Sequence, residues 1–156
     1  MTTPFPNVRS LDLASEEPGT GELVSSANAF LDEFRWAKPT GKIWVGEAIP
    51  EVLGVFLLEL DPGFEDIDRY IWVVVGDVPP AYISSEHARS PKEALEGYVA
   101  EMRAWVRAVE NGEPVDHLIP VNGAATKANA VALKSRLEFI AARILTGELA
   151  KGSQPS

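Results

Sequence analysis

Two consecutive segments of this chain are apolar at odd and even positions alike: VLGVFLLEL at residues 52–60 and RYIWVVVGD at residues 69–77. A strand directs alternate side chains to opposite faces of a sheet, so a strand that is apolar throughout needs cover on both faces. We expect helices to cover one face of these strands. The other face must be covered by the N-terminal segment, by a further helix or by a partner chain.

The flanking segments complete the predicted fold. KIWVGEAI at residues 42–49 is another strand candidate, and short turns make the three strands antiparallel neighbours. Apolar residues at helical spacing predict one helix before the strands, starting at Thr20, and two helices after them. The result is an α+β fold, a small antiparallel sheet of about three strands with three packed helices in the order α-β-β-β-α-α. We expect a flexible N-terminal arm at residues 1–19, a single α+β domain at 20–147 and a frayed tail at 148–156.

The two later helices are marked by different signals. Ser90 can cap a helix, Pro91 suits its first position, and Glu93 completes a capping box. Asn111-Gly112 is a typical end for that helix. The last helix is predicted to place one apolar side on the core, made of Val131, Leu133, Leu137, Ile140, Ala141 and Ile144.

Composition excludes several classes of function. The 156 residues include no cysteine, so disulfides, thiolate nucleophiles, thiolate zinc sites and iron–sulfur clusters are excluded. Fourteen Lys and Arg against twenty-three Asp and Glu give a net charge of -9, which argues against nucleic-acid binding. A secretion signal and a bilayer-spanning apolar run are both missing, so we expect a cytoplasmic protein that does not bind membranes. No metal or cofactor is expected, because no P-loop, HExxH motif or comparable ligand spacing occurs.

Acidic residues gather in ELDPGFEDID at residues 59–68. Three interpretations stay open: a surface that docks a basic protein, a hard-cation site without EF-hand spacing, or a solvated turn. Trp36, near the end of the first helix, is predicted to be partly exposed and is therefore a candidate interface anchor. The other three tryptophans are predicted to lie in the core. The predicted partner-binding residues are Glu59, Asp61, Glu65, Asp66, Asp68 and Trp36.

The stretch YIWVVVGDVPPAYIS, at residues 70–84, crosses a double proline after an apolar strand. Proline cannot donate a hydrogen bond to a sheet, so the stretch is predicted to be a rigid connector from strand to helix. Tyr82 and Ile83 are expected to fold back toward the core. The alternative is a pocket at the strand end, in which a carboxylate, a phenol and an imidazole perform acid–base chemistry. The candidate pocket residues are Asp77, Tyr82, Glu86 and His87.

The Trp-containing strand, the Gly-Asp-x-Pro-x-x-Tyr turn and the Pro-headed helix after it carry a resemblance. The residues concerned are Trp72, Gly76, Asp77, Pro79, Tyr82, Pro91 and Ala94. Together they resemble a family of small bacterial proteins built on a domain of unknown function, although Ala81 stands where that family has an acidic residue. The resemblance implies a fold. In size, acidity and α+β character the chain is also similar to bacterial toxin immunity proteins.

Three functional hypotheses follow. The first is a non-catalytic binding or inhibitor protein, in its narrower form an immunity protein that neutralises a bacterial toxin by contact with a basic surface. The second is a small-molecule-binding or hydrolytic enzyme that uses the candidate pocket. The third is a homodimeric structural protein that buries the second face of its sheet against a second copy.

Overall fold

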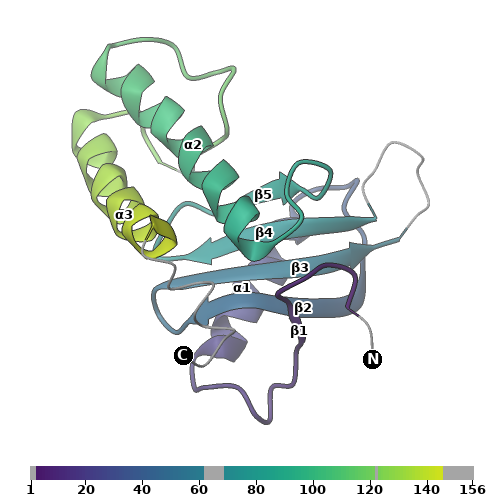
Figure 1. Ribbon diagram of the computed structural model, residues 1–156. Helices are drawn as coiled ribbons and strands as arrows, with labels where there is room; N and C mark the ends of the chain where they lie inside the picture. The colour runs from purple at the N-terminus through teal and green to yellow at the C-terminus, as the bar shows by residue number, and fades with distance from the viewer. Residues whose placement is uncertain (1–2, 62–68, 122, 146–156) are drawn as a thin grey trace.

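The computed structural model describes residues 3–61, 69–121 and 123–145. The sheet is antiparallel, with its strands in the order β1-β2-β3-β4-β5 (Figure 1). The prediction of an α+β fold with three helices is confirmed, but the sheet has five strands where three were predicted. The elements are β1 (Arg9–Ser10), α1 (Thr20–Asp32), β2 (Pro39–Ile49), β3 (Leu53–Leu60), β4 (Tyr70–Gly76), β5 (Ala81–Ser84), α2 (Pro91–Glu110) and α3 (Lys127–Leu145).

The two central strands, β3 and β4, are buried on both faces. Phe56, Leu58 and Val73 belong to the core under α1, whereas Leu57 and Trp72 belong to the core under α2 and α3. Figure 1 shows α1 on one side of the sheet and the α2–α3 pair on the other. The second face is therefore covered by a helix of the same chain.

Strand β5 corrects the prediction that the stretch around the double proline is only a connector from strand to helix. Ala81 pairs with Val74 of β4, so the chain turns back and adds a fifth strand before it reaches α2. Pro79 and Pro80 lie in the turn, where a missing N–H removes no ladder hydrogen bond. The carbonyl of Pro79 accepts a hydrogen bond of 2.6 Å from the hydroxyl of Tyr98, which ties the turn to α2.

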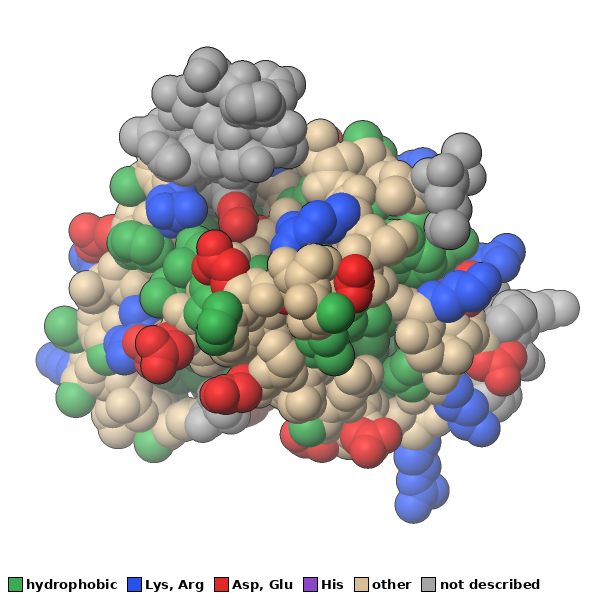
Figure 2. Space-filling model, turned by 90° about the horizontal axis from the view of Figure 1, so that it is seen from below, with side chains coloured by type: hydrophobic (Ala, Val, Ile, Leu, Met, Phe, Trp, Pro, Cys, Tyr) green, Lys and Arg blue, Asp and Glu red, His purple; other side chains and the backbone are tan. Residues whose placement is uncertain are grey.

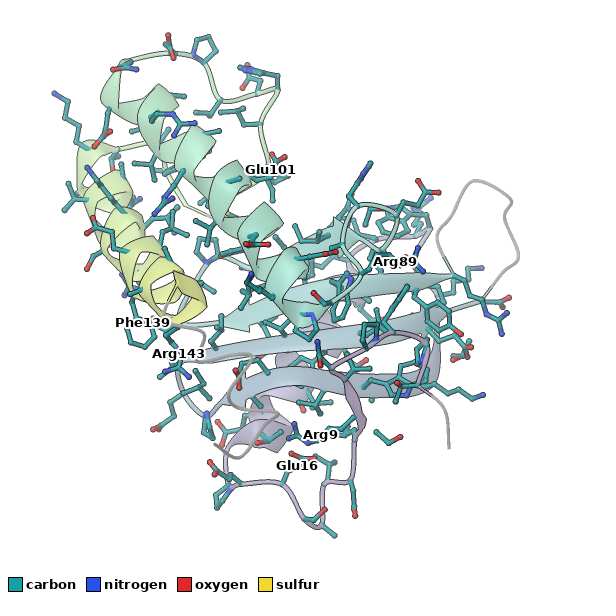
Figure 3. All side chains as sticks on the ribbon, viewed as in Figure 1. Arg9, Glu16, Arg89, Glu101, Phe139 and Arg143 are labelled. Carbon is teal, nitrogen blue, oxygen red and sulfur yellow. The ribbon has the colours of Figure 1, made fainter. Side chains whose placement is uncertain are left out.

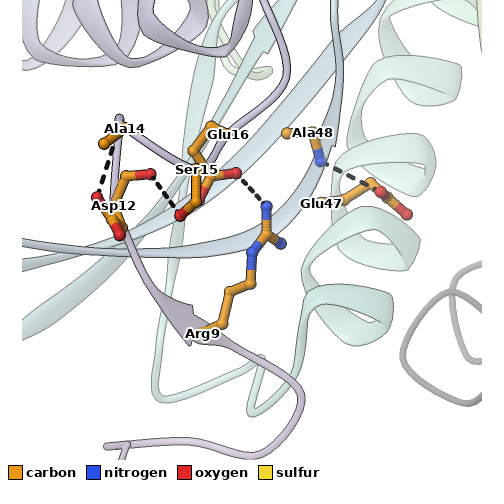
Figure 4. Close-up of polar contacts among 7 residues, drawn as sticks. All are labelled: Arg9, Asp12, Ala14, Ser15, Glu16, Glu47 and Ala48. Atoms are coloured by element: carbon orange, nitrogen blue, oxygen red, sulfur yellow. Dashed lines mark hydrogen bonds and ion pairs between the residues drawn. The ribbon is translucent and has the colours of Figure 1, made fainter.

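The N-terminal segment contacts the sheet between Phe5 and Leu11. Strand β1 pairs with β2 through Arg9 and Val45, and Arg9 also forms an ion pair with Glu16 (Figure 4). The ring of Phe5 stacks on Trp72 at a centroid distance of 6.1 Å, and the Arg89 guanidinium lies over it at 4.8 Å. This segment extends the apolar cover that α2 and α3 provide on the same face of the sheet.

Helix α2 begins as its sequence predicts. The Ser90 hydroxyl accepts a hydrogen bond of 3.2 Å from the backbone N–H of Glu93. The Glu93 carboxylate in turn accepts one of 2.7 Å from the N–H of Arg89, one residue before the cap. Just ahead of this cap, the indole N–H of Trp72 donates to the carbonyl of Ala88 at 2.8 Å. The start of α2 is thus anchored to the middle of β4.

Helix α3 buries a narrower face than the sequence suggested. Leu133, Leu137 and Ile140 pack in the core, but Val131, which was predicted to lie beside them, is 64% exposed. That part of the prediction was wrong, because a step of two residues rotates a side chain by about 160° around the helix, away from Leu133.

Two glycines test this arrangement. Gly76 ends β4 with φ at 130°, and an added Cβ would lie 2.3 Å from the carbonyl oxygen of Val52. Gly76→Ala is expected to lower the free energy of unfolding by roughly 3 kcal/mol, because both the backbone and the contact are strained. Gly97→Ala, whose Cβ would meet only Ile83 at 3.8 Å, is expected to raise it by about 0.5–1 kcal/mol. Urea denaturation measures both, and equal effects of the two variants would contradict the turn geometry.

Candidate functional site

A groove runs along the free side of β5. Its volume is about 500 Å³. Within the described ranges β5 is the last strand of the sheet and pairs with β4, and the groove lies along its other side. We call it the β5 groove, and it is lined by Phe30, Phe34, His87, Gly97, Glu101 and residues 80–84 and 117–120.

One wall of the β5 groove is aromatic. Phe30 lies in the last turn of α1 and Phe34 just after the end of that helix, and their ring centroids lie 5.1 Å from each other. The ring of Tyr82 meets Phe34 at 5.3 Å and Trp36 at 5.0 Å. Of the two residues expected to fold back toward the core, Ile83 packs against it half-buried, whereas Tyr82 lies on the α1 side of the sheet and is 40% exposed.

The opposite wall carries the polar groups. Glu101 extends from α2 on the side that looks toward β5 (Figure 3), and His117 comes from the loop after α2. A local turn fixes the position of His87, since its N–H donates to the carbonyl of Ser84 at 3.2 Å. The hydroxyl of Ser84 also accepts a hydrogen bond of 3.1 Å from the N–H of Glu86. A carboxylate, a phenol and two imidazoles therefore border one partly apolar groove.

The structure divides the four residues predicted to share a pocket. Tyr82 and His87 both line the β5 groove, and Glu86 is exposed beside His87. Asp77 lies elsewhere, at the end of β4, where its carboxylate pairs with the guanidinium of Arg136 at 3.2 Å. It borders two other cavities, of about 360 and 290 Å³.

The predicted acidic surface is divided as well. Glu59 is buried in β3, whereas Asp61 is exposed just after that strand. Glu65, Asp66 and Asp68 lie outside the described residues. Trp36 is half-buried beside Tyr82 at the rim of the aromatic wall. On the face shown in Figure 2, acidic side chains alternate with basic and apolar ones.

Glu59 has a structural role in the sheet. Its carboxylate accepts a hydrogen bond of 2.8 Å from the Thr40 hydroxyl and a longer contact of 3.4 Å from Arg69. The Thr40 hydrogen bond, aided by the charges of Lys42 and Arg69, holds the pKa of Glu59 below its ordinary value despite burial. Glu47, in β2, behaves in the opposite way, because burial raises the pKa of its carboxyl.

Most residues of the β5 groove were not predicted as site residues, among them Phe30, Phe34, Glu101 and His117. The spacing of the two phenylalanines indicates a helix, but the same spacing is found in helices that face a core. His117 lies in a loop without a motif, and Glu101 is one of several acids on α2. Only their convergence on β5 identifies them.

No metal site and no membrane span are found among the described residues. No group of three or more His, Asp or Glu side chains gathers there in a way that could hold a metal ion. None of the helices in the described ranges combines the length and apolar character needed to cross a bilayer. No family model, curated protein or solved structure matches the chain, so the resemblance noted from the sequence stays an expectation.

The Thr40–Glu59 hydrogen bond leads to a prediction about pH. Thr40→Val is expected to raise the pKa of Glu59 and to lower the free energy of unfolding at neutral pH by about 1 kcal/mol. Because the folded pKa of Glu59 lies below its unfolded value, its stabilisation is present above the unfolded pKa and is lost as the pH falls through the folded pKa. The difference between wild type and variant should therefore shrink in acid, as measured by urea denaturation at a series of pH values. In a Glu59→Gln background, Thr40→Val should have the same effect at every pH, and a persistent pH dependence there would refute the assignment.

Proposed function

We propose that this chain is a non-catalytic binding protein that holds an extended, basic segment of another protein along β5. The observation that carries the proposal is the position of the groove beside β5, the last strand of the sheet that the described residues form. Such an edge presents backbone N–H and C=O groups that can pair with a further strand. The groove leaves room for that strand, with side chains on both of its faces.

The walls of the β5 groove suit the side chains of an added strand. Alternate residues of an extended segment point to opposite faces, so one set would meet Phe30, Phe34 and Tyr82 on the α1 side. The other set would meet Gly97 and Glu101 on the α2 side. The absence of a side chain at Gly97 widens the groove at that point.

Charge favours a basic segment. Glu101 contributes a carboxylate, and no Lys or Arg occurs among the described residues that line the β5 groove. The whole chain has a net charge of -9, which attracts a cationic partner at long range. An apolar segment with interspersed Lys or Arg side chains fits both the aromatic wall and this charge.

A narrower form of the proposal is an inhibitor of a toxin. An immunity protein of this kind would cover a basic surface of its target, and the exposed Asp61 and the net acidity of the chain support that role. Growth provides the test: expression of the chain should protect cells from a toxin encoded beside its gene. If variants with substitutions in the β5 groove still protect the cells, the toxin binds to another surface of the chain.

A second candidate function uses the same groove for a small molecule. Tyr82, His87, Glu101 and His117 all line it, which provides acid and base groups beside an aromatic wall. His87→Gln and His117→Gln would abolish turnover by such an enzyme. The same substitutions leave the strand edge and the aromatic wall in place, so they should preserve binding of an extended peptide.

Peptide binding tests the main proposal. Arrayed peptides in which Lys alternates with Leu or Val should bind the wild-type chain, and NMR shift changes should centre on β5. Gly97→Phe is expected to weaken that binding by roughly tenfold or more, because the ring fills the groove. Gly97→Ala is the matched control and should bind like the wild type, since its Cβ stands at ordinary contact distance from Ile83.

Two charge-reversal variants of α2 test whether the groove selects a basic segment. Glu101→Lys should weaken binding and reduce its dependence on salt, because it reverses the charge inside the groove. Glu96→Lys makes the same change on an exposed part of α2 that does not line the groove, and it should have a much smaller effect. Equal effects of the two variants, or shift changes centred away from β5, would contradict the proposal.

A further inference from the structure

The outward side of α3 is apolar where solvent would favour polar residues. We call it the α3 outer face and define it by Ala128, Val131, Ser135, Phe139 and Ala142, all of which are exposed. Val131 is 64% exposed and Phe139 47%. Four large hydrophobic side chains are exposed among the described residues, and two of the four, Val131 and Phe139, lie on this one face of α3.

This face lies directly opposite the buried side of α3. On a helix of 3.6 residues per turn, each member of the α3 outer face falls within about 40° of Ser135. Leu133, Leu137 and Ile140 point the other way, into the core shared with α2. Helix α3 is thus apolar on two opposite sides, and the described part of this chain leaves the members of the outer side exposed. An apolar face of this kind marks an interaction surface.

The spacing of the α3 outer face is compatible with a two-fold axis. From Ala128 to Ala142 the steps are three, four, four and three residues, a pattern that reads the same in both directions from Ser135. We propose that this face binds a second copy of the chain, with the two α3 helices antiparallel about a two-fold axis at Ser135. Val131 then lies opposite Phe139 of the second copy, and Ala128 lies opposite Ala142. In a two-fold contact the same surface meets itself. Here the large Phe139 would meet the smaller Val131, and the two small alanines would meet each other.

Charge on the flanks of the face agrees with the same arrangement. Lys134 and Glu138 lie on one flank, four residues apart and centred within one residue of the axis. In an antiparallel pair, corresponding flanks meet, so Lys134 faces Glu138 of the second copy on each side of the axis, in addition to Glu110 of its own chain at 4.0 Å. On the other flank the charge of Arg136 is offset by Asp77 of its own chain, at 3.2 Å.

The shape of the surface also suits a partner helix. Ala128, Ser135 and Ala142 are small, which permits close approach of two helices. Ser135 and Phe139 both border the cavity of about 290 Å³, whose apolar lining includes Val52 and Val78. Phe139 and Arg143 project from the end of α3 (Figure 3), with the guanidinium 5.7 Å from the ring centroid. The α3 outer face shares no residue with the β5 groove, so the two proposals stand or fall separately.

Cross-linking tests the two-fold axis directly, because the chain has no cysteine of its own. Under mild oxidation Ser135→Cys should form a disulfide-linked dimer, since the two copies of residue 135 meet at the axis. Ala128→Cys should not, because its two copies are about 21 Å apart along the helices. The double variant Ala128→Cys, Ala142→Cys should cross-link again. The same yield from Ser135→Cys, Ala128→Cys and the exposed control Leu13→Cys would overturn the proposal.

Sedimentation velocity over a concentration series tests dimerisation without any cross-linking. The wild type should approach twice the chain mass of 16.9 kDa, whereas Phe139→Glu should remain monomeric. Leu13→Glu, at an exposed leucine outside α3, should dimerise like the wild type. Lys134→Glu and Glu138→Lys should each weaken dimerisation, and the double exchange should restore it. A wild type that stays monomeric throughout, or a double exchange that restores nothing, would refute the antiparallel pair.

Discussion

The rest of the structure depends on the burial of β3 and β4 on both faces. Neither strand has a solvent-exposed polar side. Folding is therefore favourable only when an apolar layer covers each of the two faces of the pair. Helix α1 supplies one layer, and α2 with α3 supplies the other. Because the two layers lie on opposite faces, they stand on either side of the sheet edge at β5. The β5 groove is the space between them at that edge.

A few hydrogen bonds hold that edge in place. The indole of Trp72 and the hydroxyl of Tyr98 are both buried, and each donates to a carbonyl in the segment that connects β4 to α2. Burial raises the pKa of Tyr98, so its hydroxyl remains a donor over the whole physiological range. The connection around β5 is therefore fixed by the core, and the groove beside it is a preformed feature of the fold.

The two surfaces proposed for binding lie on different elements. The β5 groove uses α1, β5, α2 and the loop after α2, whereas the α3 outer face uses only the solvent side of α3. Helix α2 separates them, since it contributes to the groove and also packs against the buried side of α3. Dimerisation through α3 would leave the β5 groove of each copy open.

The sequence by itself determined the features that depend on near neighbours in the chain. The capping box at Ser90, the periodicity of α2 and the apolar runs of β3 and β4 are local patterns, and each predicted its element correctly. It also required cover for both faces of the central strands. Only the tertiary structure decided that α1 supplies the second layer, that β5 joins the sheet, and that Val131 faces solvent. It alone placed Phe34, Tyr82 and Glu101 around one groove. Such proximity between distant segments depends on how the helices pack on the sheet, and no periodic pattern in the sequence predicts it.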